Sequence, residues 1–370
     1  MRFTTCFILL FVLAAAAPAY ATNPVLPTEG LEQRVDFWKK IYTQYGADDV
    51  VIHDRVYVNL IYGVATSETQ SDKISDIQTA LREIQAKLDM PADLSESSAQ
   101  IVEAITAQGL TTTTGLIDDL LASIHTQLGI KERFRDGVIR SGRYVNKFRE
   151  IMNSQGVPEE LALLPLVESS FQNARSKAGA VGVWQFTTGT GRSYLRISSR
   201  VDERLDPVRS SEAAARLMRD NYSSLGAWPL AITAYNHGRG GMLQAQKLYG
   251  SELPAIIDGY RGPVFGYASM NFYSEFMAAV EVYGNYSEYF GELVLETPSS
   301  IPADRPVLKA STTRAKPAAK AAPAAAKYKV QSGDTLFEIA QRFGTSIRTL
   351  MDKNKLSNPV IYAGQILLVK

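Results

Sequence analysis

Apolar side chains recur at helical spacing along most of this chain. From residue 31 to 45 they repeat every three or four positions, which predicts an amphipathic helix, and the same period dominates from about 71 to 154. Two short extended pieces are expected at 50–52 and 56–58, on either side of a polar triplet. The pattern predicts a mainly α-helical protein that begins with a helical accessory region at residues 22–130.

The first residues have the features of an export signal. Arg2 precedes an apolar run at 7–17, and Ala19-Tyr20-Ala21 supplies a small-x-small cleavage pattern. The run is too short to span a bilayer after export, and the sole cysteine, Cys6, precedes it. We expect a signal peptide at 1–21 and an exported product of the periplasm or cell envelope, with no integral membrane span.

Composition narrows the possible chemistry. A mature chain without cysteine has neither disulfides nor a thiol nucleophile, and three histidines are too scattered for metal-ligand spacing. Residues 300–370 hold 12 Lys and Arg against 4 Asp and Glu, which suits an anionic polymer or a solvated tail equally. We expect no metal, no cofactor and no nucleic-acid partner.

A change of composition divides the chain near its end. Residues 296–327 are rich in Pro, Ala and Lys and poor in large apolar groups, so they cannot offset the entropy of ordering. This segment is predicted to be a linker between two folded parts, at 131–295 and 328–370.

Three short strings carry the candidate chemistry. They read LLPLVESSF at 163–171, GVWQF at 182–186 and AYNHG at 234–238. On a helix from Pro158 to Ser169, Glu168 shares a stripe with Leu161 and Leu164 and points inward, where desolvation and the helix C-terminus raise a carboxyl pKa. Glu168 is therefore either a general acid or a buried glutamate satisfied by a structural ion pair.

The other two strings offer groups that bind sugars. Glycines at 179, 182 and 191 predict backbone that a pyranose ring can approach, beside the amide of Gln185. Trp184 and Phe186 are more typical of core than of a stacking platform. Tyr235 and Asn236 end a helix that begins at Trp228, where they line a cleft or simply terminate the helix.

In this order the strings resemble the Glu-Ser, Gly-x-x-Gln and Ala-Tyr-Asn-x-Gly signatures of soluble-lytic-transglycosylase-like domains, which are lysozyme-related. The residues VDERLDP at 201–207 bring the chain closer to the membrane-bound lytic murein transglycosylase D branch. The resemblance covers about 133–291 and implies a lysozyme-like catalytic domain. It makes Glu168 catalytic and places Ser176, Gln185, Tyr235, Asn236 and Tyr273 at the sugar site, although Phe272 competes with Tyr273 for the last position.

The resemblance also implies the reaction. Glycosidases usually need two carboxylates, and we interpret the acidic cluster at 202–206 as structural. A single acid suffices if Glu168 protonates the oxygen between N-acetylmuramic acid (MurNAc) and N-acetylglucosamine (GlcNAc) and then removes the C6 hydroxyl proton. The product is a 1,6-anhydro-MurNAc end, and no water is consumed.

The last residues resemble the lysin motif, or LysM domain, through VQSGDTL at 330–336, NKL at 354–356 and IYAGQ at 361–365. This resemblance implies a β-α-α-β unit that binds the glycan strands of peptidoglycan. Leu336 is either a core residue or a glycan contact. The implied glycan-binding residues are Gly333, Asp334, Thr335, Leu336, Pro359 and Ile361.

Two other functions stay open. A hydrolytic muramidase would use water and a second carboxylate. A wall-binding scaffold would retain the fold without turnover.

Overall fold

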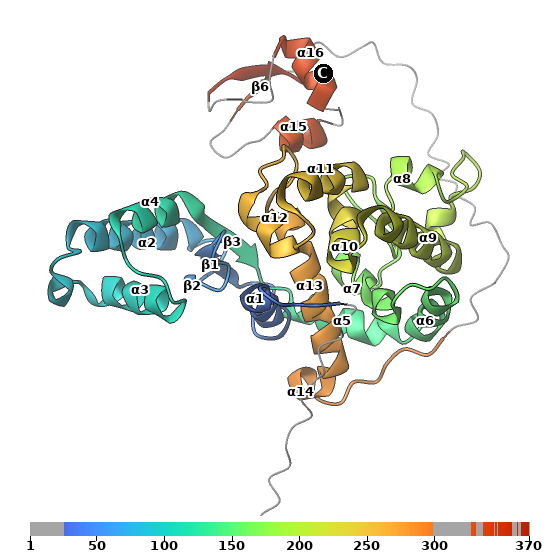
Figure 1. Cartoon of the computed structure of the whole chain (residues 1–370), viewed down its shortest axis with the longest axis horizontal. Helices are drawn as coiled ribbons and strands as arrows, with labels where there is room; N and C mark the ends of the chain where they lie inside the picture. The colour runs from blue at the N-terminus through green and yellow to red at the C-terminus, as the bar shows by residue number, and fades with distance from the viewer. Residues whose placement is uncertain are drawn as a thin grey trace, which may run out of the picture. The chain divides into compact units, whose positions relative to one another are not determined.

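The computed structural model describes residues 26–298, 327–330, 336–343, 345, 347–356, 361 and 364–369. The expected signal peptide and most of the expected linker lie outside these residues. The described chain is mainly helical with small antiparallel sheets, as the periodicity predicts. It divides into two compact units, the smaller of which holds residues 327–369 (Figure 1).

The larger unit begins with α1 (Glu32–Thr43), which confirms the predicted amphipathic helix. Strands β1 (Val50–Asp54), β2 (Ile61–Ala65) and β3 (Ile124–Leu128) form an antiparallel sheet in the order β2-β1-β3. The extended piece expected at 56–58 is wrong, because β2 lies farther along the chain. Three helices cover this sheet: α2 (Gln70–Ala86), α3 (Glu96–Ala107) and α4 (Thr114–Ser123).

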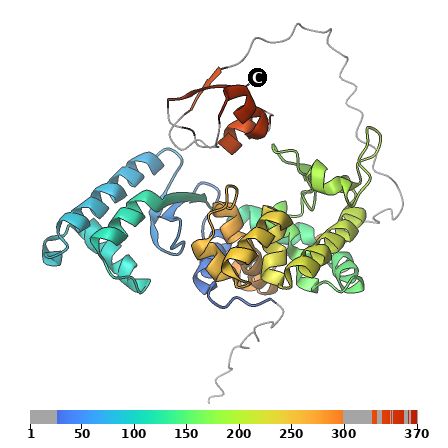
Figure 2. The same cartoon turned by 45° about the horizontal axis from the view of Figure 1, so that its top comes forward.

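Strand β1 is buried on both faces and separates two cores. Val51 belongs to the main core, whereas the next residue, Ile52, belongs to the smaller core beneath α2, α3 and α4. Successive side chains of a strand point to opposite faces, so one strand serves both cores. Figures 1 and 2 show the α2–α4 layer on one side of the sheet and the helical body on the other.

The helical body holds the three strings. Its elements are α5 (Lys131–Ser141), α6 (Val145–Ser154), 3₁₀ helix η2 (Glu159–Leu163), α7 (Pro165–Glu168), β4 (Ala174–Arg175), β5 (Val181–Gly182), α8 (Thr188–Arg192), 3₁₀ helix η3 (Glu203–Leu205), α9 (Pro207–Leu225), α10 (Trp228–His237), α11 (Arg239–Tyr249), α12 (Leu253–Gly259), α13 (Tyr267–Gly284) and α14 (Tyr286–Phe290). Helix α13 packs against α1, α7 and α10.

The boundary predicted at 130–131 runs through this packing, since α1 lies N-terminal to it and packs against α13. The boundary stays a prediction. No helix among the described residues combines the length and apolar character needed to cross a bilayer.

The smaller unit has the predicted β-α-α-β order. Its elements are β6 (Lys327–Lys329), α15 (Leu336–Arg342), α16 (Ile347–Asn354) and β7 (Ile366–Leu368). The two strands pair antiparallel, with Tyr328 opposite Leu367. Its core includes Val330, Ile339 and Leu350.

Candidate active site

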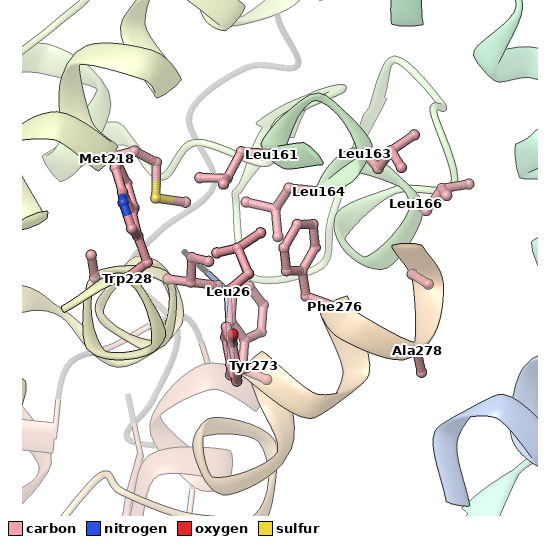
Figure 3. Close-up of a cluster of buried hydrophobic side chains, with 14 of the residues drawn as sticks. Leu26, Leu161, Leu163, Leu164, Leu166, Met218, Trp228, Tyr273, Phe276 and Ala278 are labelled. Carbon is pink, nitrogen blue, oxygen red and sulfur yellow. The ribbon is translucent and has the colours of Figure 1, made fainter. Parts of the chain in front are cut away.

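Glu168 is the last residue of α7, a single helical turn. The segment was expected to be one helix, but Pro165 lacks an N–H and its ring clashes with a preceding carbonyl, so the chain forms η2 and then restarts as α7. The leucines of the predicted stripe, Leu161 and Leu164, are fully buried. Figure 3 shows Phe276 of α13 pointing toward Leu164 and closing this core.

The backbone directly after Glu168 is strained. Ser170 and Phe171 have φ of 51° and 58°, a left-handed conformation that costs about 1–3 kcal/mol per residue without glycine. Two guanidinium groups of α5 hold it: Arg133 Nε donates to Ser170 Oγ at 3.1 Å, and Arg140 Nε donates to the Ser170 carbonyl at 2.8 Å. The turn that ends α7 is therefore clamped.

The Glu168 carboxyl lies in a desolvated environment that also holds a second carboxyl, Glu275. The Glu168 side chain is half-buried. Burial, followed by the charge of Glu275 on α13, raises the pKa of Glu168 to about 8. A carboxyl with this pKa is mostly protonated at pH 7, as a general acid requires.

Tyr235 is the second group at this point. Burial and the charge of Glu168 raise its pKa well above 10, so the phenol stays neutral. Its hydroxyl donates to the Trp184 carbonyl at 2.6 Å. Its ring lies 6.1 Å from Phe186, edge to face, and 6.4 Å from Phe272 in a nearly parallel plane. The structure thus brings the second and third strings into contact, and Glu168 of the first string lies close enough to raise the pKa of Tyr235.

Gln185 lies in a turn, where its side-chain amide is held by backbone carbonyls. It has a φ of 49°, and its Nε2 donates to the Gly182 carbonyl at 2.7 Å and to the Ala174 carbonyl at 3.3 Å. Gly182 has a φ of 88°, and a Cβ there would lie 1.8 Å from the Arg204 carbonyl. Open space for a sugar was expected above this glycine, and that prediction is wrong because η3 fills it.

Trp184 and Phe186 are core residues, which was the favoured interpretation. Both are buried, and Trp184 Nε1 donates to Ser211 Oγ at 2.7 Å. Ser176 is exposed in the loop between β4 and β5, where its hydroxyl accepts a hydrogen bond from the Ala180 N–H at 3.0 Å.

Asn236 lies in the last turn of α10, which ends at Gly238 with a φ of 92°. The side chain is exposed, and its Oδ1 accepts a hydrogen bond from Ser269 Oγ at 2.8 Å. The contact fixes which end of the amide faces α13. The amide nitrogen faces the other way.

Tyr273 and Phe272, the two candidates for one position, point in different directions. Tyr273 is fully buried, and its hydroxyl donates to the Pro27 carbonyl at 2.9 Å. Phe272 stacks on Tyr235. Phe272, rather than Tyr273, therefore stands beside the groups gathered around Glu168.

The acidic cluster at 202–206 has the structural roles that we expected. Asp202 is buried in an ion pair with Arg204 at 2.8 Å, Glu203 pairs with Arg196, and Asp206 Oδ1 caps α9 by accepting from two N–H groups. None of the three is available as a second catalytic carboxylate.

Glu275 was not among the site residues predicted from the sequence. It occupies a half-buried position in α13, and burial raises its pKa to about 8. The available signal was a single glutamate inside the apolar run FYSEFMAA at 272–279. Periodicity alone could not place it, since its proximity to Glu168 depends on how α13 packs against α7.

In the smaller unit, Leu336 is buried in the core and Ile361 packs against it. The core alternative for Leu336 is confirmed. Gly333, Asp334, Thr335 and Pro359 lie outside the described residues.

Comparison with known proteins adds family assignments. The Transglycosylase SLT domain matches residues 147–256, and the LysM domain matches 328–370. The chain carries both domains. The SLT match covers α7, the β4–β5 hairpin and α10, and it ends before α13, which carries Phe272, Tyr273 and Glu275.

Two curated relatives match different lengths of the chain. Membrane-bound lytic murein transglycosylase D of Escherichia coli K12 is 38% identical over 120 residues, which are 32% of this chain and 26% of that protein. Cell wall-binding protein YocH of Bacillus subtilis is 50% identical over 44 residues, 12% of this chain and 15% of that protein. The chain thus spans about a quarter or less of the length of these relatives.

Proposed function

We propose that the protein is a peptidoglycan lytic transglycosylase that cleaves the MurNAc-GlcNAc β-1,4 bond and leaves 1,6-anhydro-MurNAc ends. The proposal is supported mainly by the state of Glu168. This carboxyl has a pKa of about 8, belongs to the segment that the SLT domain matches and lies near a neutral tyrosine, Tyr235. A pKa near the working pH lets one group both donate and accept a proton.

Glu168 is the only protein group that needs to donate and accept a proton in the proposed reaction. Protonated Glu168 gives its proton to the GlcNAc O4 as the bond to MurNAc C1 breaks. The substrate acetamido oxygen stabilises the positive charge at C1. Glu168, now a carboxylate, then removes the proton of the MurNAc C6 hydroxyl as that oxygen bonds to C1, which restores the starting enzyme.

The remaining residues would hold the sugar. Tyr235 offers an oxygen that can accept a hydrogen bond from the acid, since its own proton is directed to Trp184. Asn236 and Gln185 present amide groups, and Ser176 an exposed hydroxyl. In this proposal Phe272 takes the aromatic position that the sequence analysis gave to Tyr273.

The LysM domain would bind the same glycan and keep the catalytic domain on it. The proposed linker, 296–327, makes the second binding event intramolecular and so raises the local concentration of the enzyme. This role places the protein at the cell envelope on peptidoglycan, in the periplasm if residues 1–21 direct export.

The test is an end-group analysis of purified sacculi digested with the full chain. Mass spectrometry distinguishes anhydro ends, which are lighter by one water, from reducing ends. Anhydro ends released by the wild type but not by Glu168→Gln would support the proposal. Glu159→Gln, an exposed residue of the preceding 3₁₀ helix, is the matched control and should leave activity unchanged.

Glu275 favours a second candidate, a hydrolytic muramidase, because it supplies a second carboxyl near the first. In that case the fragments would carry reducing ends and incorporate ¹⁸O from labelled water. A protein that binds sacculi without releasing any fragment would instead be a wall-binding scaffold.

A further inference from the structure

The turn that follows the proposed acid is joined to two other segments of the fold. Ser169 Oγ donates to the Val183 carbonyl at 2.7 Å, which ties the turn to the second string. Ser170 is held by the two guanidinium groups of α5, Arg133 and Arg140. Both serines are buried. The position of the turn therefore depends on contacts that come from outside α7.

Helix α5 approaches this turn closely because it has a glycine at the contact. A Cβ on Gly137 would lie 3.0 Å from Ser170 Cβ and 3.2 Å from Leu166 Cδ2. These distances are shorter than ordinary van der Waals contact, so a larger residue would push α5 and the turn apart. Arg133 lies four residues before Gly137 and Arg140 three residues after it, so the three share one face of the helix. We refer to these three residues as the α5 clamp.

The turn needs such contacts because its backbone conformation is unfavourable. Ser170 and Phe171 both have positive φ, in a region that only glycine enters without steric cost. Strained residues of this kind persist only where the surrounding structure holds them. If the clamp were removed, the turn would relax toward a more favourable region, and Glu168, two residues earlier, would move with it. Catalytic groups need to be held within about 0.5 Å of their productive position.

We propose that the α5 clamp positions the Glu168 carboxyl for proton transfer by holding the turn after it in this conformation. Arg133 and Arg140 are positioning residues, because they act through Ser170 and not on the sugar. The clamp precedes the segment that the SLT domain matches, so the acid depends on a helix outside that segment. This inference rests on the proposed function, because it assigns the clamp a part in the cleavage reaction.

The test is a set of variants of the full chain, assayed as anhydro-end release from soluble, uncrosslinked glycan strands. Arg140→Met removes the donor to the Ser170 carbonyl and keeps a long side chain. It should lower kcat about tenfold and change KM by less than about twofold, since the residues proposed to hold the sugar lie on other elements. Arg135→Met is the control on the same helix. Arg135 is exposed and pairs with Asp136 at 2.9 Å, and its loss should change neither constant.

A second substitution separates positioning from general stability. Ser170→Gly makes positive φ favourable at this residue and keeps the carbonyl that accepts from Arg140. In this background Arg140→Met should lower kcat by no more than about threefold, because the turn no longer needs the clamp to the same extent. An equal loss of kcat in both backgrounds would overturn the proposal, since relief of strain at Ser170 would then have no effect.

Amide hydrogen exchange tests the clamp without turnover. In this turn the Ser169 and Phe171 N–H groups both donate to the Pro165 carbonyl, at 3.1 and 3.0 Å. These two amides should exchange about tenfold faster in Arg140→Met than in the wild type. If Arg140→Met does not fold, Arg133→Met replaces it in both measurements, because Arg133 is exposed and its loss removes only one bond to the turn. The same changes are expected, with smaller size.

The outcomes distinguish this inference from the proposed function. Unchanged kcat in Arg140→Met would overturn the positioning role and leave the transglycosylase intact. A fall in kcat without faster exchange would also overturn it, because Arg140 would then act on the reaction without holding the turn. If the wild type releases no fragments, the proposed function fails and so does the catalytic part of this inference, while hydrogen exchange still decides whether α5 holds the turn.

Discussion

The Tyr235 hydroxyl donates a 2.6 Å hydrogen bond to the main-chain carbonyl of Trp184. This bond joins the last turn of α10 to the string GVWQF. It also orients the phenol, because its only proton is used and the oxygen can then only accept.

The first prediction concerns this bond. Tyr235→Phe should slow cleavage about tenfold, equivalent to about 1.4 kcal/mol, because Glu168 loses an oriented neighbour while the ring packing remains. The free energy of unfolding should fall by about 1 kcal/mol, since the Trp184 carbonyl loses its donor. Initial rates on sacculi and urea denaturation measure the two effects.

Tyr222→Phe is the matched control, because this half-exposed tyrosine stacks on Trp228 at a ring distance of 4.3 Å. It should change neither quantity appreciably. Equal loss of sacculus binding and of cleavage in Tyr235→Phe would contradict a role in the chemical step.

The second prediction follows from the raised pKa of Glu168. The folded protein binds this proton up to a pH of about 8, whereas the unfolded chain releases it near 4.5, so the contribution of Glu168 to stability falls as pH rises between these values. Glutamine does not titrate, so the stability of Glu168→Gln lacks this decrease with rising pH. Its melting temperature relative to wild type should therefore increase from pH 5 to pH 9.

Differential scanning calorimetry at several pH values checks this second prediction, with Glu159→Gln as the control. A difference between Glu168→Gln and wild type that stays constant across the range would mean that the native carboxyl titrates normally.

The third prediction concerns the buried ion pair beneath the Gln185 turn. Asp202 and Arg204 are buried, and Arg204 also donates to the Phe186 carbonyl at 3.1 Å. Asp202→Asn leaves that guanidinium without its buried countercharge and should cost about 3–5 kcal/mol of unfolding free energy. Chemical denaturation measures this cost.

A comparison pair lies at the surface. Glu212→Gln breaks the contact of Glu212 with Arg209, in which both side chains are partly exposed, and should cost at most about 1 kcal/mol. Similar losses in the two variants would show that burial does not decide the effect.

The fourth prediction separates binding from turnover. Deleting residues 328–370 should weaken sacculus pull-down, because the LysM domain no longer holds the enzyme on the glycan. Turnover of short soluble glycans should stay unchanged, since they do not engage two sites at once. Loss of activity on those short substrates would contradict independent modules.

Local rules predicted much of this architecture. Pro229 and Gly238 bracket α10 as expected. The β-α-α-β order of residues 327–369 is the one that the LysM resemblance implied. The predicted inward stripe of Leu161, Leu164 and Glu168 is retained although the helix is interrupted at Pro165. Both leucines stay buried because η2 and α7 keep them on the inner side.

The predictions that were wrong or incomplete concerned contacts between segments that are distant in the sequence. Open space was predicted at Gly182, but the Arg204 carbonyl lies where a Cβ of this residue would stand. The choice between Phe272 and Tyr273 needed the rotation of α13, which turns one toward Tyr235 and the other toward Pro27. The influence of Glu275 on the pKa of Glu168 depends on the packing of α13 on α7, which the local sequence does not encode.

The alternation along β1 has a consequence for how the larger unit comes apart. Because Val51 and Ile52 bury their side chains in different cores, pulling the strand out would open both cores at once. The two layers are thus expected to melt together in one calorimetric transition. A fragment cut to start at residue 131 would lose β1 and the α1 surface that shields α13, and is expected to aggregate rather than to work as a minimal enzyme.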